Sequence, residues 1–125
     1  MKIDGYHHVA LMVQDMAKSL KLYEGLGGKI VHSFGPPERV IHLLDLGGNA
    51  TLELIPDGKG TDEKDPHFAH IALRTDEPDV AFELALKLGA TERSPGRDAD
   101  LGGVKIRNAF VYGPDKEVIE FFLVK

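Results

Sequence analysis

The chain has 125 residues, of which 42% are apolar, and this is enough to form one compact domain with a buried core. Its formal net charge of −5 argues against non-specific nucleic-acid binding, and no apolar run approaches the roughly 18 residues that span a bilayer. The lack of cysteine excludes disulfides, thiolate metal sites and cysteine nucleophiles. Because the first residues carry no basic start followed by an apolar stretch, we expect no signal peptide and a cytoplasmic location.

The first half of the chain reads as a strand, a helix and three further strands. Apolar residues alternate from His7 to Val13, which predicts a strand. Asp15 is a suitable N-cap for the helix that follows, and Gly27-Gly28 can end that helix with a left-handed cap. Strand-like runs then lie at 29–34, 39–46 and 50–55, separated by proline and glycine turn residues.

The second half repeats this order. Residues 70–73 predict a strand, Asp79 can cap the next helix, and Gly89 can close it. Strand-like runs follow at 90–94, 104–112 and 118–124, and Pro95-Gly96 is expected to form the turn after the first of them. Residues 57–66 are polar and glycine-rich, so they predict a linker between the two halves.

A sequence repeat relates the two halves. His8-Val9-Ala10-Leu11 matches His70-Ile71-Ala72-Leu73, and Leu26-Gly27 matches Leu88-Gly89 at the same separation of 62 residues. We therefore expect a single domain over residues 1–125 that consists of two βαβββ repeats, about 5–56 and 67–125, in the α+β class.

Four polar residues lie inside apolar strands and recur in both halves: His8, Glu53, His70 and Glu120. Side chains alternate between the two faces of a strand, so each of these residues faces away from its apolar neighbours. Buried charge is costly without a partner, and a divalent ion satisfies two imidazoles and two carboxylates together. Mixed nitrogen and oxygen ligands suit Ni, Zn, Co, Mn or Fe. The pattern predicts one divalent metal per site, in a pocket that these four side chains line.

Two further residues near these positions need an interpretation. His7 shares a strand face with apolar residues and has an alanine as its repeat equivalent, so we interpret it as structural. Arg74 shares a face with His70 and is the candidate for binding an anionic group of a substrate. The alternative for Arg74 is a surface ion pair with a neighbour such as Asp76.

These motifs resemble the vicinal oxygen chelate superfamily, which includes glyoxalase I, methylmalonyl-CoA epimerase, extradiol dioxygenases, and fosfomycin and bleomycin resistance proteins. The segments that carry the resemblance are His8–Asp15, Leu22-Tyr23, Leu26-Gly27, Leu52–Leu54, His70–Leu73 and Val118–Glu120. The resemblance implies paired βαβββ modules that form a cupped mixed sheet around a metal ion, and it implies a homodimer. The ligand order His, Glu, His, Glu is most similar to bacterial glyoxalase I (lactoylglutathione lyase), whereas methylmalonyl-CoA epimerases usually carry Gln in place of Glu53.

The resemblance to glyoxalase I implies a lyase or isomerase that moves a proton next to a carbonyl group. In such enzymes the metal stabilises an enediolate. Glu120 is our first choice of base, and Glu53 either acts on the opposite face of the substrate or remains a ligand. The implied substrate is a 2-oxoaldehyde thiol adduct. Met12 and Asp57 stand where glutathione-dependent enzymes typically have Arg and Asn, so the identity of the thiol stays open.

Two other functions stay open. An acyl-CoA epimerase similar to methylmalonyl-CoA epimerase would need basic residues at the mouth of the pocket, and Arg97, Lys105 and Arg107 are available. A non-catalytic binding or resistance protein would use the pocket to sequester a small molecule. In every case the expected partner is a small molecule, and neither nucleic acid nor a membrane is expected.

Overall fold

The computed structural model describes residues 1–56, 67–113 and 116–125, so the predicted linker 57–66, which includes Asp57, lies outside the described residues. The chain divides into two compact units. The first unit is His8–Ala69, and the second unit combines Met1–His7 with His70–Lys125. Within the described ranges, no helix is long and apolar enough to cross a membrane.

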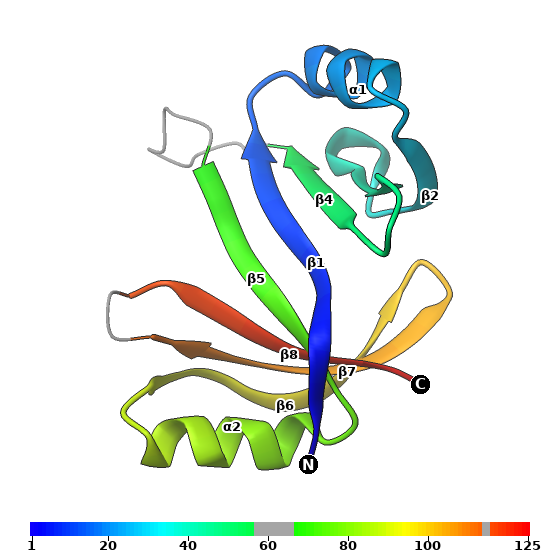
Figure 1. Ribbon diagram of the computed structural model, residues 1–125. Helices are drawn as coiled ribbons and strands as arrows, with labels where there is room; N and C mark the ends of the chain where they lie inside the picture. Colours follow the sequence, from blue (N-terminus) through cyan, green and yellow to red (C-terminus); the bar gives the residue numbers. More distant parts are fainter. Residues whose placement is uncertain (57–66, 114–115) are drawn as a thin grey trace. The chain divides into compact units, whose positions relative to one another are not determined.

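Over the described residues 8–56, the first unit contains one helix and four strands (Figure 1). They are β1 (Ile3–Val13, of which the part from His8 belongs here), α1 (Met16–Gly25), β2 (Lys29–Phe34), β3 (Ile41–Asp45) and β4 (Thr51–Pro56), with a 3₁₀ turn at Pro37–Arg39. The strand order is β2-β3-β4-β1. Strands β1 and β4 run parallel, and the other two pairings are antiparallel.

The core of the first unit lies between α1 and one face of these strands. Leucines and a valine from the strands are buried there, and partly buried residues of α1 pack against them: Val13, Leu44, Leu52 and Leu54 on the strands, with Met16, Leu20 and Tyr23 on the helix. The Asp15 side chain accepts a hydrogen bond from the Lys18 amide, which confirms the predicted N-cap. Gly27 has a φ of 104°, so the predicted left-handed helix end is also confirmed.

The second unit also contains one helix and a set of strands. They are β5 (His67–Thr75, of which the part from His70 belongs here), α2 (Pro78–Lys87), β6 (Thr91–Leu101), β7 (Val104–Tyr112) and β8 (Val118–Val124), in the order β5-β8-β7-β6. Helix α2 packs on one face of β6, β7 and β8, where its Ala81 and Phe82 meet Ala109, Val111 and Phe121 (Figure 1). The opposite face carries Ala72, Ile106 and Phe122. The order βαβββ thus occurs twice along the chain, and the predicted α+β class is confirmed.

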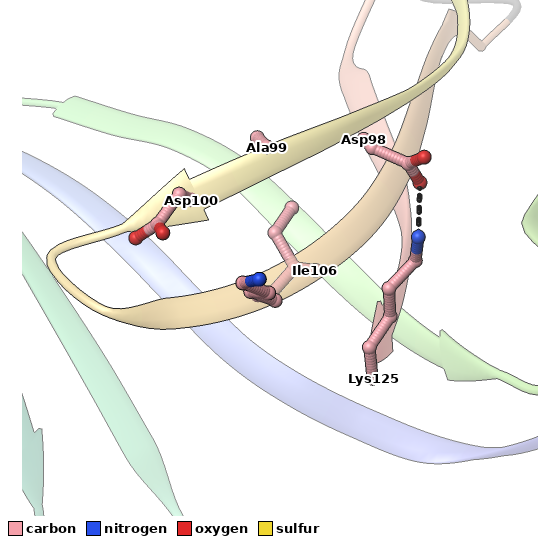
Figure 2. A pocket seen from close by; sticks show the side chains of 6 residues that line it. Asp98, Ala99, Asp100, Ile106 and Lys125 are labelled. Atoms are coloured by element: carbon pink, nitrogen blue, oxygen red, sulfur yellow. Dashed lines mark ion pairs between the residues drawn. The ribbon is translucent and has the colours of Figure 1, made fainter.

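Strand β6 differs from its prediction. The turn expected at Pro95-Gly96 is wrong, because β6 continues to Leu101 with an irregular register between Ser94 and Arg97. Proline is tolerated there because β6 is the last strand in the order of its unit, and a bulge absorbs the missing amide donor. Ion pairs tie β6 to its neighbours, and Figure 2 shows the one in which Lys125 Nζ lies 2.8 Å from Asp98 Oδ1.

The expected cap at Asp79 is also wrong. Helix α2 begins at Pro78, so Asp79 lies in its first turn, and the side chain of the N-cap residue, Glu77, makes no capping hydrogen bond. Proline suits the first helical position, where its missing amide would have no partner in any case. Asp79 is instead bound by both Nε and Nη2 of Arg107, at 2.6 Å and 2.8 Å. This two-point ion pair fastens the start of α2 to β7.

Candidate metal-binding residues

The first unit contains one buried histidine–glutamate pair. His8 lies on β1 and Glu53 on β4, and both side chains are buried. In this parallel strand pair Ala10 is the register partner of Glu53, so His8 is two residues before that partner and shares its strand face. His8 Nε2 and Glu53 Oε1 lie 3.8 Å apart. The glutamate is enclosed among strands whose opposite face carries the core under α1.

The second unit contains the equivalent pair. His70 lies on β5 and Glu120 on β8, and Ala72 is the register partner of Glu120. His70 is therefore again two residues before the partner of the glutamate, as in the first unit. His70 Nε2 and Glu120 Oε2 lie 3.0 Å apart, and only 4% of the Glu120 side chain is exposed.

Two residues of β7 complete the surroundings of the second pair. Asn108 Nδ2 donates a 2.9 Å hydrogen bond to Glu120 Oε1. The Phe110 ring stands edge-on to the His70 imidazole, with ring centroids 5.9 Å apart. Asn108 and Phe110 alternate with Ala109, which packs in the core under α2, so they face the same side as Glu120. Neither residue could be assigned to the site from the sequence, because only the pairing of β7 with β8 shows which face of β7 lies on the same side as Glu120.

The chemistry of both pairs fits a divalent cation. A buried carboxylate is costly unless it is paired or bound to a metal. Metal bonds to histidine nitrogen and carboxylate oxygen are about 2.1 Å long, so two ligand atoms of one ion lie about 3–3.5 Å apart. The 3.0 Å separation between His70 and Glu120 matches this spacing, and the 3.8 Å separation between His8 and Glu53 is slightly longer. Each unit therefore offers one nitrogen and one oxygen donor that suit the same group of metals.

The other candidate residues have different surroundings. Arg74 is half exposed and pairs with Asp4, with Nε 2.8 Å from Oδ1, rather than with Asp76. The His7 ring packs against Phe122 at a centroid distance of 4.1 Å. Arg107 binds Asp79 and Asp98 on the helix-covered side of β7, so it takes part in structural ion pairs.

Arg97 differs from these arginines. It is exposed on β6 and is the register partner of Asn108, so its side chain leaves the strand on the same face as Asn108 and Glu120. Lys105, the third basic residue considered for an acyl-CoA substrate, alternates with Ile106 and lies on the other face of β7.

Solved structures with the same fold support this description of the chain. A hypothetical protein from Bacillus halodurans C-125 aligns with a TM-score of 0.72 and 18% identity, covering 97% of this chain and 92% of that one. Methylmalonyl-CoA epimerase from Mycobacterium tuberculosis aligns with a TM-score of 0.72 and 20% identity, covering 96% and 87%. A mutant of 4-hydroxymandelate synthase from Streptomyces coelicolor aligns with a TM-score of 0.81 and 18% identity, covering 100% of this chain and 43% of that one. The chain thus has the glyoxalase-like α+β fold.

The sequence itself defines the family. The chain belongs to the Glyoxalase/Bleomycin resistance protein/Dioxygenase superfamily, whose family model matches residues 5–121. This confirms the resemblance to the vicinal oxygen chelate superfamily. No curated protein matches the chain.

Proposed function

We propose that the chain is a metal-dependent enzyme that moves a proton next to a carbonyl group, as glyoxalase I does. One divalent ion is held by His8, Glu53, His70 and Glu120. The observation that carries the proposal is the repetition of a histidine–glutamate pair, with a buried glutamate and the same strand register, in both units. Chance placement of polar residues in apolar strands does not account for such a repetition, whereas a shared ligand does.

The roles of these residues follow from their chemistry. When bound, the divalent ion acts as a Lewis acid for the oxygens of a carbonyl substrate. His8 and His70 would hold the ion through imidazole nitrogen. Glu120, held on β8 between His70 and Asn108, is the base that takes a proton from a substrate carbon and returns it to the neighbouring carbon. Glu53 either stays a ligand or acts from the opposite side.

A methylmalonyl-CoA epimerase-like reaction is the second candidate. Two observations favour it: methylmalonyl-CoA epimerases are among the structures with the same fold, and Arg97 is an exposed cation on the face of β7 and β6 that carries Asn108. Glu53 favours the glyoxalase-like reaction, because methylmalonyl-CoA epimerases usually carry Gln at that position. A non-catalytic binding protein is the outcome if neither reaction is found.

Metal analysis is the first experiment. Purified protein is dialysed against Ni, Co, Zn or Mn, and bound metal is measured by elemental analysis. We expect one equivalent per chain. Less than about half an equivalent with every metal contradicts the proposed site, because a site of four nitrogen and oxygen ligands should retain a divalent ion through dialysis.

Solvent deuterium exchange then tests the reaction. The metal-loaded protein is incubated in D₂O with the hemithioacetal of methylglyoxal and glutathione, and separately with methylmalonyl-CoA. Deuterium incorporation into the first substrate supports the glyoxalase-like reaction, and incorporation into the second supports the epimerase. Exchange with neither substrate contradicts both reactions and supports a binding protein.

A further inference from the structure

Asn108 is a buried polar residue whose contacts single it out on β7. Only 5% of it is exposed. Its register partner on β8 is Phe122, two residues beyond Glu120, so the amide reaches Glu120 along the diagonal of the strand pair. Nδ2 donates to Glu120 Oε1 over 2.9 Å. The contact lies wholly within the second unit.

The orientation of the amide is set by the carboxylate. An ionised carboxylate only accepts hydrogen bonds, so the Nδ2 donor must face Glu120 and Oδ1 must point away. Across residues 1–56, 67–113 and 116–125, no group donates to the buried Oδ1 atom. An unsatisfied buried acceptor is unfavourable. The side-chain amide of Asn108 thus makes a hydrogen bond to Glu120 through Nδ2, while its Oδ1 atom has no donor among the described residues.

The two oxygens of Glu120 thereby acquire different surroundings. Oε1 is held by Asn108, and Oε2 lies 3.0 Å from His70 Nε2. We propose that Asn108 is a positioning residue for Glu120: it keeps Oε1 turned away from His70, so that the carboxylate offers a metal ion one oxygen and keeps the other for proton transfer. This inference rests on the proposed function of the pair. Without the amide donor the carboxylate can rotate and present both oxygens to the ion.

Three variants separate positioning from packing. Asn108→Leu keeps the approximate volume but removes the donor. Asn108→Thr restores a hydroxyl donor on a strand-compatible side chain. Ile106→Val is the matched control, because Ile106 is buried on the same face of β7, two residues before Asn108, and makes no polar contact with Glu120.

The first readouts are metal affinity and deuterium exchange with the methylglyoxal–glutathione hemithioacetal. We expect Asn108→Leu to lower kcat for exchange by about 10- to 100-fold and to change the metal Kd, since partners of metal ligands typically have effects of this size. KM should stay within about twofold, because the change affects the base rather than substrate binding. Asn108→Thr should recover most of the loss, and Ile106→Val should behave as wild type.

A second readout needs neither metal nor substrate. In ¹⁵N-labelled metal-free protein, the side-chain amide protons of Asn108 should be shifted downfield and should move when Glu120 is replaced by Gln. If the wild type takes up metal and exchanges deuterium but Asn108→Leu matches Ile106→Val, the positioning role is wrong and the proposed function stands. If the wild type takes up no metal, the proposed function is wrong. The amide spectrum then decides alone whether Asn108 holds Glu120, and an amide insensitive to Glu120→Gln overturns the inference.

Discussion

At the scale of single residues, burial and pairing distinguish the site from other charged groups. Glu53 and Glu120 are buried, whereas the aspartates that pair with arginine or lysine in the second unit are about half exposed or more. Exposed pairs contribute little to stability. Burying a carboxylate is costly for folding. Buried carboxylates such as Glu53 and Glu120 are therefore better explained by a functional role than by a contribution to the stability of the fold.

Glu120→Gln tests the base directly. An amide cannot take a proton from carbon, so we expect kcat for deuterium exchange to fall by at least about 100-fold. Much of the metal should remain bound, because the amide oxygen is still a weak ligand and the three other proposed ligands persist. Elemental analysis and exchange rates are the measurements. Glu92→Gln, an exposed substitution on β6, is the control and should change neither. Unchanged turnover in Glu120→Gln means that another residue is the base.

At the scale of elements, the contact between α2, β6 and β7 explains the irregular part of β6. A Cβ atom at Gly96 would collide with the Asp79 carboxylate and lie 3.0 Å from Arg107 Nη2. Glycine within this bulged strand thus makes room for the ion pair at the start of α2. Hydrogen bonds from Arg107, more than its charge alone, lower the pKa of Asp79. Asp98 also has a lowered pKa, because it accepts hydrogen bonds from Lys125 and Arg107.

Arg107→Met should destabilise the protein in a pH-dependent way. Because the pKa of Asp79 is lowered on folding, its contribution is complete above the unfolded-state pKa of about 4 and disappears as the pH falls through the folded-state value. Urea unfolding should therefore show wild type more stable than Arg107→Met at neutral pH, with the difference shrinking in acid. Arg97→Met is the control, since the described part of the chain gives Arg97 no ion pair, and it should show no difference. If the stability difference between wild type and Arg107→Met stays unchanged in acid, the contribution assigned to the Arg107–Asp79 ion pair is wrong.

The core of the first unit depends on β4. Leu54 is fully buried beneath α1, and truncation leaves a cavity. We expect Leu54→Ala to lower the free energy of unfolding by about 2–5 kcal/mol. Leu26, just after α1, is 74% exposed, so Leu26→Ala should change stability by less than about 0.5 kcal/mol. If Leu54→Ala and Leu26→Ala lower the free energy of unfolding in urea by the same amount, α1 does not pack on Leu54 as described.

At the scale of the whole molecule, the repeat raises the question of how many ions one chain binds. Among the four proposed ligands, each unit supplies one histidine and one glutamate, and two ligands alone make a weak site. The proposed function therefore requires both units to contribute to one ion. One shared ion and two independent sites give different numbers of bound ions per chain, and this number can be measured.

His8→Ala and His70→Ala distinguish these possibilities. With one shared ion, wild type binds one equivalent per chain, and each single variant weakens all of the binding. With two independent sites, wild type binds two equivalents, and each variant retains one. Calorimetric titration gives the stoichiometry. Thermal unfolding gives an independent check, because an ion at 100 times its Kd stabilises the folded state by about 2.7 kcal/mol. His42→Ala, whose ring bonds to Ser33, is the control.

Local and repetitive features could be predicted from the sequence. Alternation of apolar residues placed the strands, Asp15 and Gly27 marked the ends of α1, and the 62-residue repeat indicated two βαβββ modules. The same alternation placed Glu53 and Glu120 opposite the helix-covered face of their strands. These features depend on neighbours along the chain, so the sequence contains them directly.

Other features depended on the tertiary structure. The bond from Asn108 to Glu120 follows from the register of β7 on β8, and the placement of Arg107 on Asp79 follows from how α2 packs on β7. Pro95-Gly96 reads locally as a turn, yet pairing with β7 holds it in an extended strand. The sequence by itself determined the two modules and the four polar residues, His8, Glu53, His70 and Glu120, on the strand faces opposite the apolar ones. Only the tertiary structure decided which polar residues surround these four, because strand register is fixed by the packing of residues far apart in the chain.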